Sequence, residues 1–419
     1  MIKKISIDQL KPGMVIQSFV GNWPKETGQF FSRTIKNQTE ISGLKSKGIK
    51  ELFIQAGDKE AYGGASTAKD VEAALEAQLA ALEEDDEEEE EEEILPDEPS
   101  SEPFSEEAFT KELAHAENLQ TKANEIVAKA LEAVQTGGKV DRVAVKDAVN
   151  HLRDSVMRQE QALVGLAMLK NKGNHLFSHS VNMSCLLMVF FKTLGFRGDK
   201  LATVGTAGML HDLGMAKIPP NIIAKKGLLT PPERKLVQSH VEATLQQLES
   251  IPGITELELR IAAQHHERWD GSGYPRKLTG QTINREGQAA TLVDTFEAIT
   301  SQRPYRPKLD AHTALKRIMS WGKQAYDPKL TQQFVKCIGV YPIGTLVRLK
   351  NNLIGMVISN NGRHLLHPII RVVMDQTGKR VTHGKWLNLA DLQDQVGYHI
   401  KEIPTPGKKK INPLEQLSR

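Results

Sequence analysis

The stretch HHERWDGSGYP, residues 265–275, constrains the fold and chemistry of this chain more than any other. Its two adjacent histidines end an apolar helical pattern, and imidazole is a common ligand of transition metals. Asp-Gly, Ser-Gly and Tyr-Pro pairs then follow in succession, and such pairs signal turns. We therefore expect metal ligands at the end of a helix, beside a tight loop that a ligand can approach.

The region around this stretch, residues 172–338, is predicted to be all-α. Its apolar residues recur at three- and four-residue spacing, and strand patterns are nearly absent. The longest apolar run, LLMVFF at 186–191, is far shorter than the roughly 20 residues that a membrane span needs, so no membrane span is expected. We expect helices near 176–194, 199–213, 231–249, 255–267, 286–301, 311–321 and 328–338.

The rest of the chain divides where its composition changes, which gives a multidomain, mainly α fold. A helical hairpin is expected at 106–171, either as a signalling connector or, as we favour, as the first layer of the helical core. The other expected parts are a small α/β regulatory unit at 1–56, an acidic, solvated linker at 57–105, and a small β unit at 339–419 whose Pro- and Lys-rich tail is loose.

Composition favours a reduced, cytoplasmic protein. The N-terminus lacks an apolar core of signal-peptide length. Cys185 and Cys337 both lie in apolar stretches, so buried free thiols are expected rather than a disulfide. Residues 83–93 are eleven consecutive acids, and without them 54 Lys and Arg face 41 Asp and Glu, a net charge of +13. That charge suits an anionic ligand, although surface lysines also serve solubility; we expect no nucleic-acid polymer as a partner.

Side chains that bind metals recur inside the apolar patterns of the helical region. Singly, each has an ordinary explanation as a satisfied core histidine or a structural carboxylate. Together, so many buried polar groups would be costly unless compensated, and coordination of ions compensates them. Five histidines and two aspartates can hold two ions with one carboxylate bridging: His179, His211, Asp212, His240, His265, His266 and Asp294.

Two adjacent ions have a clear chemical use, because they bind both the attacking and the leaving oxygen of a phosphodiester. Cationic side chains then neutralise the charge of the phosphate. Arg303 and Arg306 follow the helix of Asp294 and can supply that charge. The pattern therefore indicates a phosphohydrolase.

The ordered motifs resemble the HD-GYP family, a branch of the HD superfamily of metal-dependent phosphohydrolases. The resemblance covers about residues 175–310, and residues 1–56 resemble the small domain often found ahead of HD-GYP domains. The matching residues are His179, His211-Asp212, His240, His265 to Pro275, Asp294 and Arg303 to Arg306.

The resemblance implies hydrolysis of the bacterial second messenger cyclic di-GMP to linear pGpG, GMP or both. It implies two divalent ions, Fe or Mn first and Mg, Ni or Zn as further options. Asp212 would bridge the ions, and Arg303 and Arg306 would contact the phosphates. His179, His211 and Asp294 would complete the ligands of one ion, and His240, His265 and His266 those of the other.

The resemblance also implies roles for residues around the ligands. Gly273, Tyr274 and Pro275 would shape the site or contact partners, including diguanylate cyclase-type domains. The ligands would be supported from behind by Glu267, Asp270 and Glu297.

The sequence departs from the family pattern at three positions. Met215 stands where a lysine is usual, His175 where some members have a glutamate for a third ion, and Glu297 where an aspartate is common. Met215 keeps open a catalytically weak cyclic dinucleotide sensor or partner-docking protein. Another cyclic dinucleotide as substrate also stays open, and the helices of 106–171 permit a homodimer.

Overall fold

The computed structural model describes residues 2–20, 33–46, 51–55, 105–169, 175–225, 229–301, 308–360, 364–382 and 384–404. The expected acidic linker lies outside these residues apart from Ser105, as does the tail beyond residue 404. Arg303 and Arg306 also lie outside them. Among the described helices, none combines the length and apolarity needed to cross a bilayer.

The N-terminal unit is a small antiparallel sheet with one helix, as predicted. Its strand order is β1-β4-β2-β3, and Ile5 of β1 pairs with Leu52 of β4. It has a separate apolar core that includes Ile16 and Ile41. The elements are β1 (Ile2–Ser6), η1 (Ile7–Gln9), β2 (Val15–Val20), β3 (Arg33–Thr34), α1 (Gln38–Ser46) and β4 (Glu51–Gln55).

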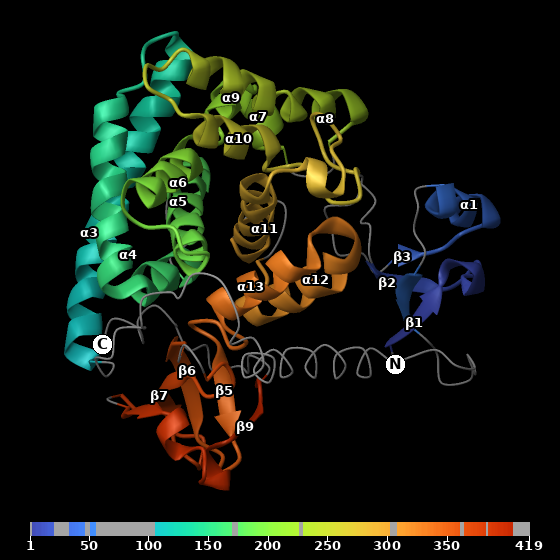
Figure 1. Ribbon diagram of the computed structural model, residues 1–419. Helices are drawn as coiled ribbons and strands as arrows, with labels where there is room; N and C mark the ends of the chain where they lie inside the picture. The colour runs from blue at the N-terminus through green and yellow to red at the C-terminus, as the bar shows by residue number, and fades with distance from the viewer. Residues whose placement is uncertain are drawn as a thin grey trace.

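Two long helices open the helical part of the chain (Figure 1). Helix α3 (Glu106–Thr136) begins where the Ser105 side chain accepts a hydrogen bond from the Ala108 amide, and ends at Gly137 in the left-handed conformation. Helix α4 (Arg142–Leu169) is interrupted at Gln159, whose backbone is not helical. Apolar side chains of both helices belong to the same core as the helices that follow.

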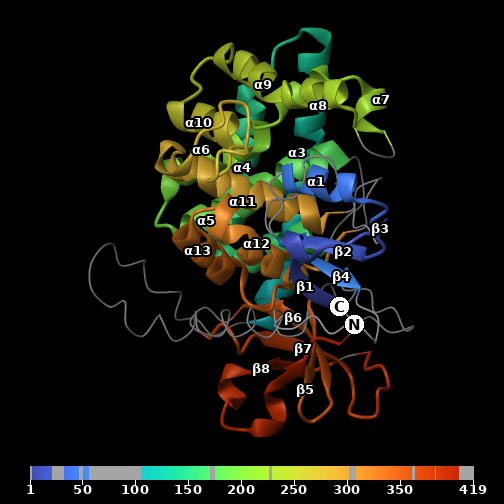
Figure 2. The ribbon, with the colours of Figure 1, turned by 90° about the vertical axis from the view of Figure 1, so that its right-hand side faces the viewer.

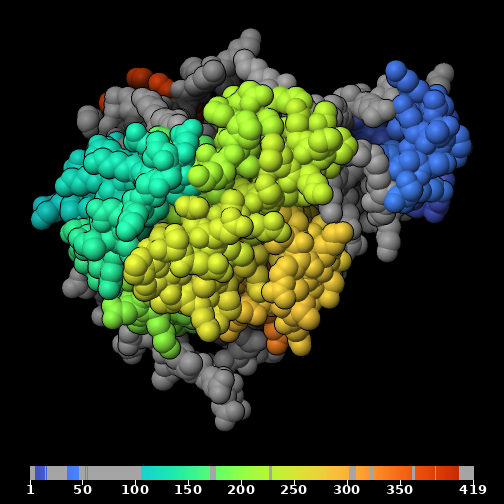
Figure 3. All heavy atoms as spheres, turned by 90° about the horizontal axis from the view of Figure 1, so that it is seen from above, coloured from blue at the N-terminus to red at the C-terminus, as the bar shows by residue number. Residues whose placement is uncertain are grey.

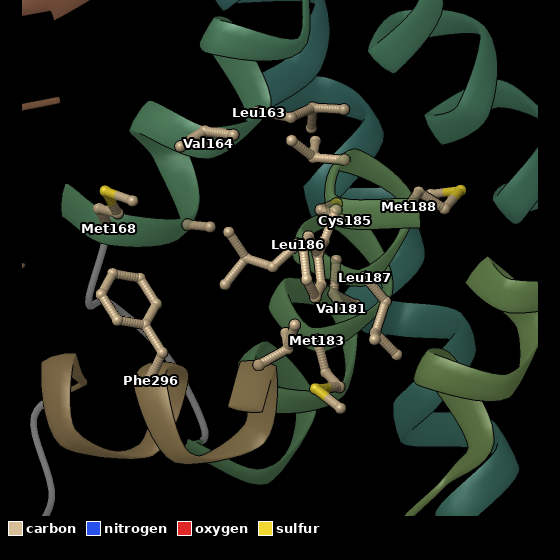
Figure 4. Close-up of a cluster of buried hydrophobic side chains, with 14 of the residues drawn as sticks. Leu163, Val164, Met168, Val181, Met183, Cys185, Leu186, Leu187, Met188 and Phe296 are labelled. Carbon is tan, nitrogen blue, oxygen red and sulfur yellow. The ribbon is translucent and has the colours of Figure 1, made fainter. Parts of the chain in front are cut away.

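The predicted all-α region is confirmed. Helix α5 is buried around its whole circumference from residue 179 to 191, so it lies at the centre of the core. Figure 4 shows its side chains, among them Leu186, beside Leu163 of α4 and Phe296 of α11. The elements are α5 (His175–Thr193), α6 (Gly198–Leu210), η3 (Leu213–Lys217), α7 (Pro220–Ile223), α8 (Pro231–Gln238), α9 (His240–Glu249), α10 (Glu256–Gln264), η4 (Gly280–Thr282), α11 (Arg285–Thr300), α12 (Ala311–Ala325) and α13 (Pro328–Ile338).

The single helix expected at 231–249 is instead two, α8 and α9, which meet at Ser239. The Ser239 hydroxyl donates to the carbonyl oxygen of Leu236, a local bond that competes with the regular helical ladder. In the space-filling view from above, the segments of α8 and α9 lie beside those of α3 and α4 (Figure 3). The break leaves His240 as the first residue of α9.

The C-terminal unit is an antiparallel sheet at one end of the helices (Figure 2), in the order β8-β7-β6-β5-β9. The stretches of β5, β6 and β7 show a strand pattern in the sequence, whereas β8 and β9 are three residues each and too short to show one. Every residue of β6 and β7 is buried, because Val357 and Ile370 face one apolar cluster and Met356 faces the helical core. The elements are β5 (Leu346–Leu349), β6 (Ile354–Ser359), β7 (Ile369–Met374), β8 (Trp386–Asn388), η5 (Ala390–Leu392), η6 (Val396–Tyr398) and β9 (Ile400–Glu402).

Candidate metal centre

His179 and Asp294 approach each other from the two central helices. His179 lies in α5, Asp294 lies in α11, and each is less than a tenth exposed. The Nε2 atom of His179 is 3.2 Å from Oδ1 of Asp294. The other carboxylate oxygen of Asp294, Oδ2, is 3.6 Å from Nδ1 of His266. Asp294 therefore faces histidines on two sides.

Asp212 holds a similar place at the end of α6. Its Oδ1 atom is 3.1 Å from Nε2 of His240 and 3.5 Å from Nε2 of His265. Its Oδ2 atom is 3.7 Å from Nε2 of His211 and 3.8 Å from Nε2 of His179. The Asp212 carboxylate thus directs Oδ1 at one pair of histidines and Oδ2 at the other pair.

Three of the histidines are oriented by the ends of helices. The Nδ1 atoms of His211, His240 and His265 lie 2.6–2.8 Å from the carbonyl oxygens of the residues three places earlier. Carbonyls in the last turn of a helix lack the regular intrahelical partner, which leaves them able to accept such bonds. An Nδ1–H that donates to such a carbonyl leaves the Nε2 lone pair facing the site.

The seven predicted ligands form two groups that are able to hold ions. In each group the potential ligand atoms lie within 4.8 Å of one another. Asp212 and Asp294 each face members of both groups, so the two lie side by side. The groups are Asp212, His240, His265 and His266, and His179, His211 and Asp294.

The donor set fits metal ions. Nε2 of His211 is buried and has no hydrogen-bond partner among the described residues. Imidazole and carboxylate together suit first-row transition metals. The two clusters are therefore consistent with a binuclear metal centre.

Burial and charge act against each other in this centre. Burial lowers the pKa of His211 to about 4, which keeps its ring neutral. Burial also lowers the pKa of His179, but the charges of Glu297 and Asp294 outweigh it and raise that pKa to about 10. Burial raises the pKa of Asp212, while His211 and His240 bring it well below the usual value. The carboxylates are thus ionised, as metal ligands must be.

Glu297 supports His179 from behind. Its Oε2 atom is 2.5 Å from Nδ1 of His179, which directs Nε2 of that ring towards Asp294. Its Oε1 atom accepts hydrogen bonds from Asn182 at 3.1 Å and Ser301 at 2.6 Å. Asn182 and Ser301 are not among the residues expected from the sequence. Their spacing is nevertheless a usable signal, because Asn182 lies three residues after His179 and Ser301 four after Glu297, which places each on the same helical face as its neighbour.

Gly214 brings Asp212 to α9. A side-chain carbon at Gly214 would lie 2.0 Å from the carbonyl oxygen of His240, so only glycine fits. The Gly214 amide donates to the Thr244 hydroxyl at 2.8 Å. Residues 213–217 can thus pack directly on the first turn of α9, which places the Asp212 carboxylate beside His240. Gly214 and Thr244 are not among the residues expected from the sequence, although a glycine two residues after the aspartate is a visible signal.

Residues 268–278, here called the GYP loop, follow the last two histidines. Glu267 is almost fully buried, and its carboxylate accepts hydrogen bonds from the amides of Arg276 and Leu278. Asp270 is exposed and accepts from the Ser272 amide at 2.9 Å, which closes a local turn. Both carboxylates were predicted to support the ligands, and both accept hydrogen bonds from backbone amides of the GYP loop.

The two arginines that were predicted to contact the phosphates cannot be placed relative to the centre. Arg303 and Arg306 lie outside the described residues. Met215 is half-buried in η3, close after Asp212, and Lys217 is exposed at the end of the same element.

Three family models match the chain. One is described as an HD domain and covers residues 164–330, which includes all seven candidate ligands. A domain of unknown function (DUF3391) covers residues 2–145, and a KOW domain associated with HD domain covers residues 346–408. The DUF3391 match extends from the N-terminal sheet through α3.

Curated relatives agree with these matches. A cyclic di-GMP phosphodiesterase of Pseudomonas aeruginosa is 30% identical over 382 residues, 90% of this chain and 87% of the relative. A cyclic di-GMP phosphodiesterase of Thermotoga maritima is 38% identical over 131 residues, 31% of this chain and 36% of the relative. A 3'3'-cGAMP-specific phosphodiesterase of Vibrio cholerae is 34% identical over 139 residues, 33% of this chain and 27% of the relative. The motif order, the helical core and the relative that matches along nearly the whole chain agree, and the chain belongs to the HD-GYP family of HD-domain phosphodiesterases.

Proposed function

We propose that this protein hydrolyses cyclic di-GMP at a two-metal centre and releases linear pGpG, GMP or both. The observation that carries the proposal is the pair of adjacent His/Asp groups. It is supported by the Pseudomonas aeruginosa relative, which is named a cyclic di-GMP phosphodiesterase and matches 90% of this chain. Lowering the level of the messenger would be its role in bacterial signalling.

In this proposal Asp212 would contribute to both ions, because its two oxygens face different histidines. Two ions supply Lewis acidity and a nucleophile at neutral pH. The neutral ring of His211 directs its Nε2 lone pair at the centre, and Glu297 holds the His179 ring so that its Nε2 atom faces the same place. Arg303 and Arg306 are proposed to contact the phosphates. The remaining ligands are His179, His211 and Asp294 for one ion and His240, His265 and His266 for the other.

Fe and Mn are the proposed ions, since five imidazoles and two carboxylates combine the donors that these metals accept. Mg, Ni and Zn are the further options. Metal analysis of protein purified without oxygen, by mass spectrometry, identifies the ions and their number. A stoichiometry of one ion or none in active protein contradicts the two-metal proposal.

The function is tested with full-length protein, cyclic di-GMP and Mn or Fe, with the products separated by chromatography. Asp212→Ala is expected to lose both bound metal and turnover, because that carboxylate faces four histidines. Asp391→Ala, in the C-terminal unit, is the matched control and should keep both. Metal-loaded wild-type protein that yields no linear product refutes the proposal.

A second candidate function is a sensor that binds a cyclic dinucleotide and turns it over weakly or not at all. Met215 favours it, because a half-buried thioether occupies the place of a phosphate-binding cation. Met215→Lys should raise the rate strongly if the missing cation limits the site. Tight binding of nucleotide without turnover would support the sensor, and rapid turnover by the wild type would exclude it.

A different cyclic dinucleotide is the third candidate substrate. The Vibrio cholerae relative named 3'3'-cGAMP-specific matches 33% of this chain. Competition between the two nucleotides in one assay separates the candidates, because the preferred substrate has the higher kcat/KM. A clear preference for 3'3'-cGAMP would replace cyclic di-GMP in the proposal.

A further inference from the structure

One of the five histidines at the centre is held differently from the other four. The rings of His179, His211, His240 and His265 each place Nδ1 within hydrogen-bonding distance of a carboxylate or carbonyl oxygen. For His266, Nδ1 is 3.6 Å from the Asp294 carboxylate, which is beyond that distance. Within the described residues, no hydrogen bond therefore fixes the His266 ring.

The GYP loop supplies another kind of contact to the His266 ring. The ring of Tyr274 is stacked on it, with centroids 4.6 Å apart and planes 30° apart. The same tyrosine meets the His240 ring at its edge, with centroids 6.3 Å apart. The Tyr274 amide also donates to the His266 carbonyl oxygen at 3.1 Å. Backbone and ring of one residue thus both engage His266.

The loop is pinned in this conformation by groups outside the ligand set. Glu267 accepts the Arg276 amide at 2.7 Å and the Leu278 amide at 3.0 Å, so the chain beyond Tyr274 is tied back to the residue after His266. Gly273 packs so closely on this backbone that a side-chain carbon would lie 2.6 Å from the His266 carbonyl oxygen. Only glycine therefore allows this approach, and Tyr274 is carried onto the imidazole.

We propose that Tyr274 is a positioning residue that orients the His266 ring for its ion by stacking. The inference rests on the proposed two-metal function and assigns a task to the GYP loop within it. Stacking takes the place of the Nδ1 hydrogen bond that orients the other four rings. The aromatic face of Tyr274 orients the His266 ring, and its phenolic hydroxyl is not needed for this role.

The test is a titration of metal-free full-length protein with Mn²⁺, followed by calorimetry and by electron paramagnetic resonance of the bound ions. Tyr274→Ala should weaken one of the two Mn²⁺ sites about 10-fold to 100-fold, the range seen when a group that orients a metal-binding histidine is lost. Tyr274→Phe should bind both ions like the wild type, because it keeps the ring. Tyr274→Leu, which fills space without a π face, should resemble Tyr274→Ala.

Tyr341→Ala is the matched control. Tyr341 also stacks on a histidine, His312, with centroids 5.8 Å apart and planes 7° apart, but His312 belongs to neither His/Asp group. This variant should bind two ions with unchanged affinity. Thermal unfolding of every variant identifies a loss of fold, in which case Tyr274→Phe against Tyr274→Leu decides the matter.

The outcomes separate this inference from the function on which it rests. Wild-type protein that binds fewer than two ions refutes the two-metal function. Two ions in the wild type and the same two affinities in Tyr274→Ala refute the positioning role and leave that function standing. A raised KM for cyclic di-GMP with unchanged Mn²⁺ affinity likewise overturns the inference and assigns Tyr274 to the substrate.

Discussion

At the scale of single residues, the centre depends on the orientation of its histidine rings as well as on their proximity. Three rings use the unpaired carbonyls of helix ends, and His179 uses the buried carboxylate of Glu297. An imidazole binds a metal through one nitrogen, so the bond at the other nitrogen decides which lone pair faces the ion. Glu297 is the carboxylate best placed to show the size of that effect.

Replacing Glu297 with Gln should weaken binding of an ion about 10-fold to 100-fold. The change keeps the shape of the side chain but removes its charge. One of the three donors around the carboxylate, on His179, Asn182 or Ser301, then meets an NH2 group. Isothermal titration with Mn²⁺ measures the change. Glu286→Gln on the same helix is the control, and equal affinities for the two variants would contradict the role given to Glu297.

At the scale of elements, several of the candidate ligands come together because they lie where helices begin or end. His211 and His265 follow the last residues of α6 and α10, and His240 begins α9 after the break at Ser239. Because these helix ends converge on one region, the short side chains of histidine and aspartate are long enough to meet there. Close packing of η3 on α9 at Gly214 completes this arrangement.

Replacing Gly214 with Ala should therefore lower both stability and metal content. The added carbon would meet the His240 carbonyl oxygen and the Thr244 amide, neither of which can move without shifting α9. Overpacking of this kind costs about 1–3 kcal/mol. Chemical denaturation and metal analysis measure the two effects. Gly138→Ala, whose added carbon would make ordinary contacts at 3.5 Å or more, should change neither; a Gly214→Ala protein with full stability would show that η3 can move freely.

At the scale of the whole molecule, one apolar core joins elements from α3 to the C-terminal sheet. It extends from Phe109 to Met374, and the Phe109 ring meets the Trp386 ring edge-on at 5.7 Å. The core is thus assembled from apolar side chains, while the polar ligands lie at one place within it. We therefore expect the helical part to fold without the ions, unlike small domains that zinc stabilises.

Removal of metal with a chelator should abolish turnover but leave the helical circular dichroism unchanged. Metal at 100 times its Kd contributes about 2.7 kcal/mol of stability. At about 2–4 °C per kcal/mol, the midpoint of thermal unfolding should fall by roughly 5–10 °C. Readdition of Mn or Fe should restore both turnover and midpoint. Loss of the helical signal on chelation would show that the fold itself needs the ions.

The sequence alone predicted the seven candidate ligands and most of the helices and strands. Helical period, strand alternation and the identity of a metal ligand are local properties, so they can be read from neighbouring residues. The tertiary structure decided what depends on distant residues: the bond between Glu297 and His179, which are 118 positions apart, and the two faces of the Asp212 carboxylate. It also decided the helix break at Ser239 and the close approach at Gly214, since both depend on how α9 packs. The HHERWDGSGYP stretch identified the family, but only the folded chain brings the Tyr274 ring onto His266.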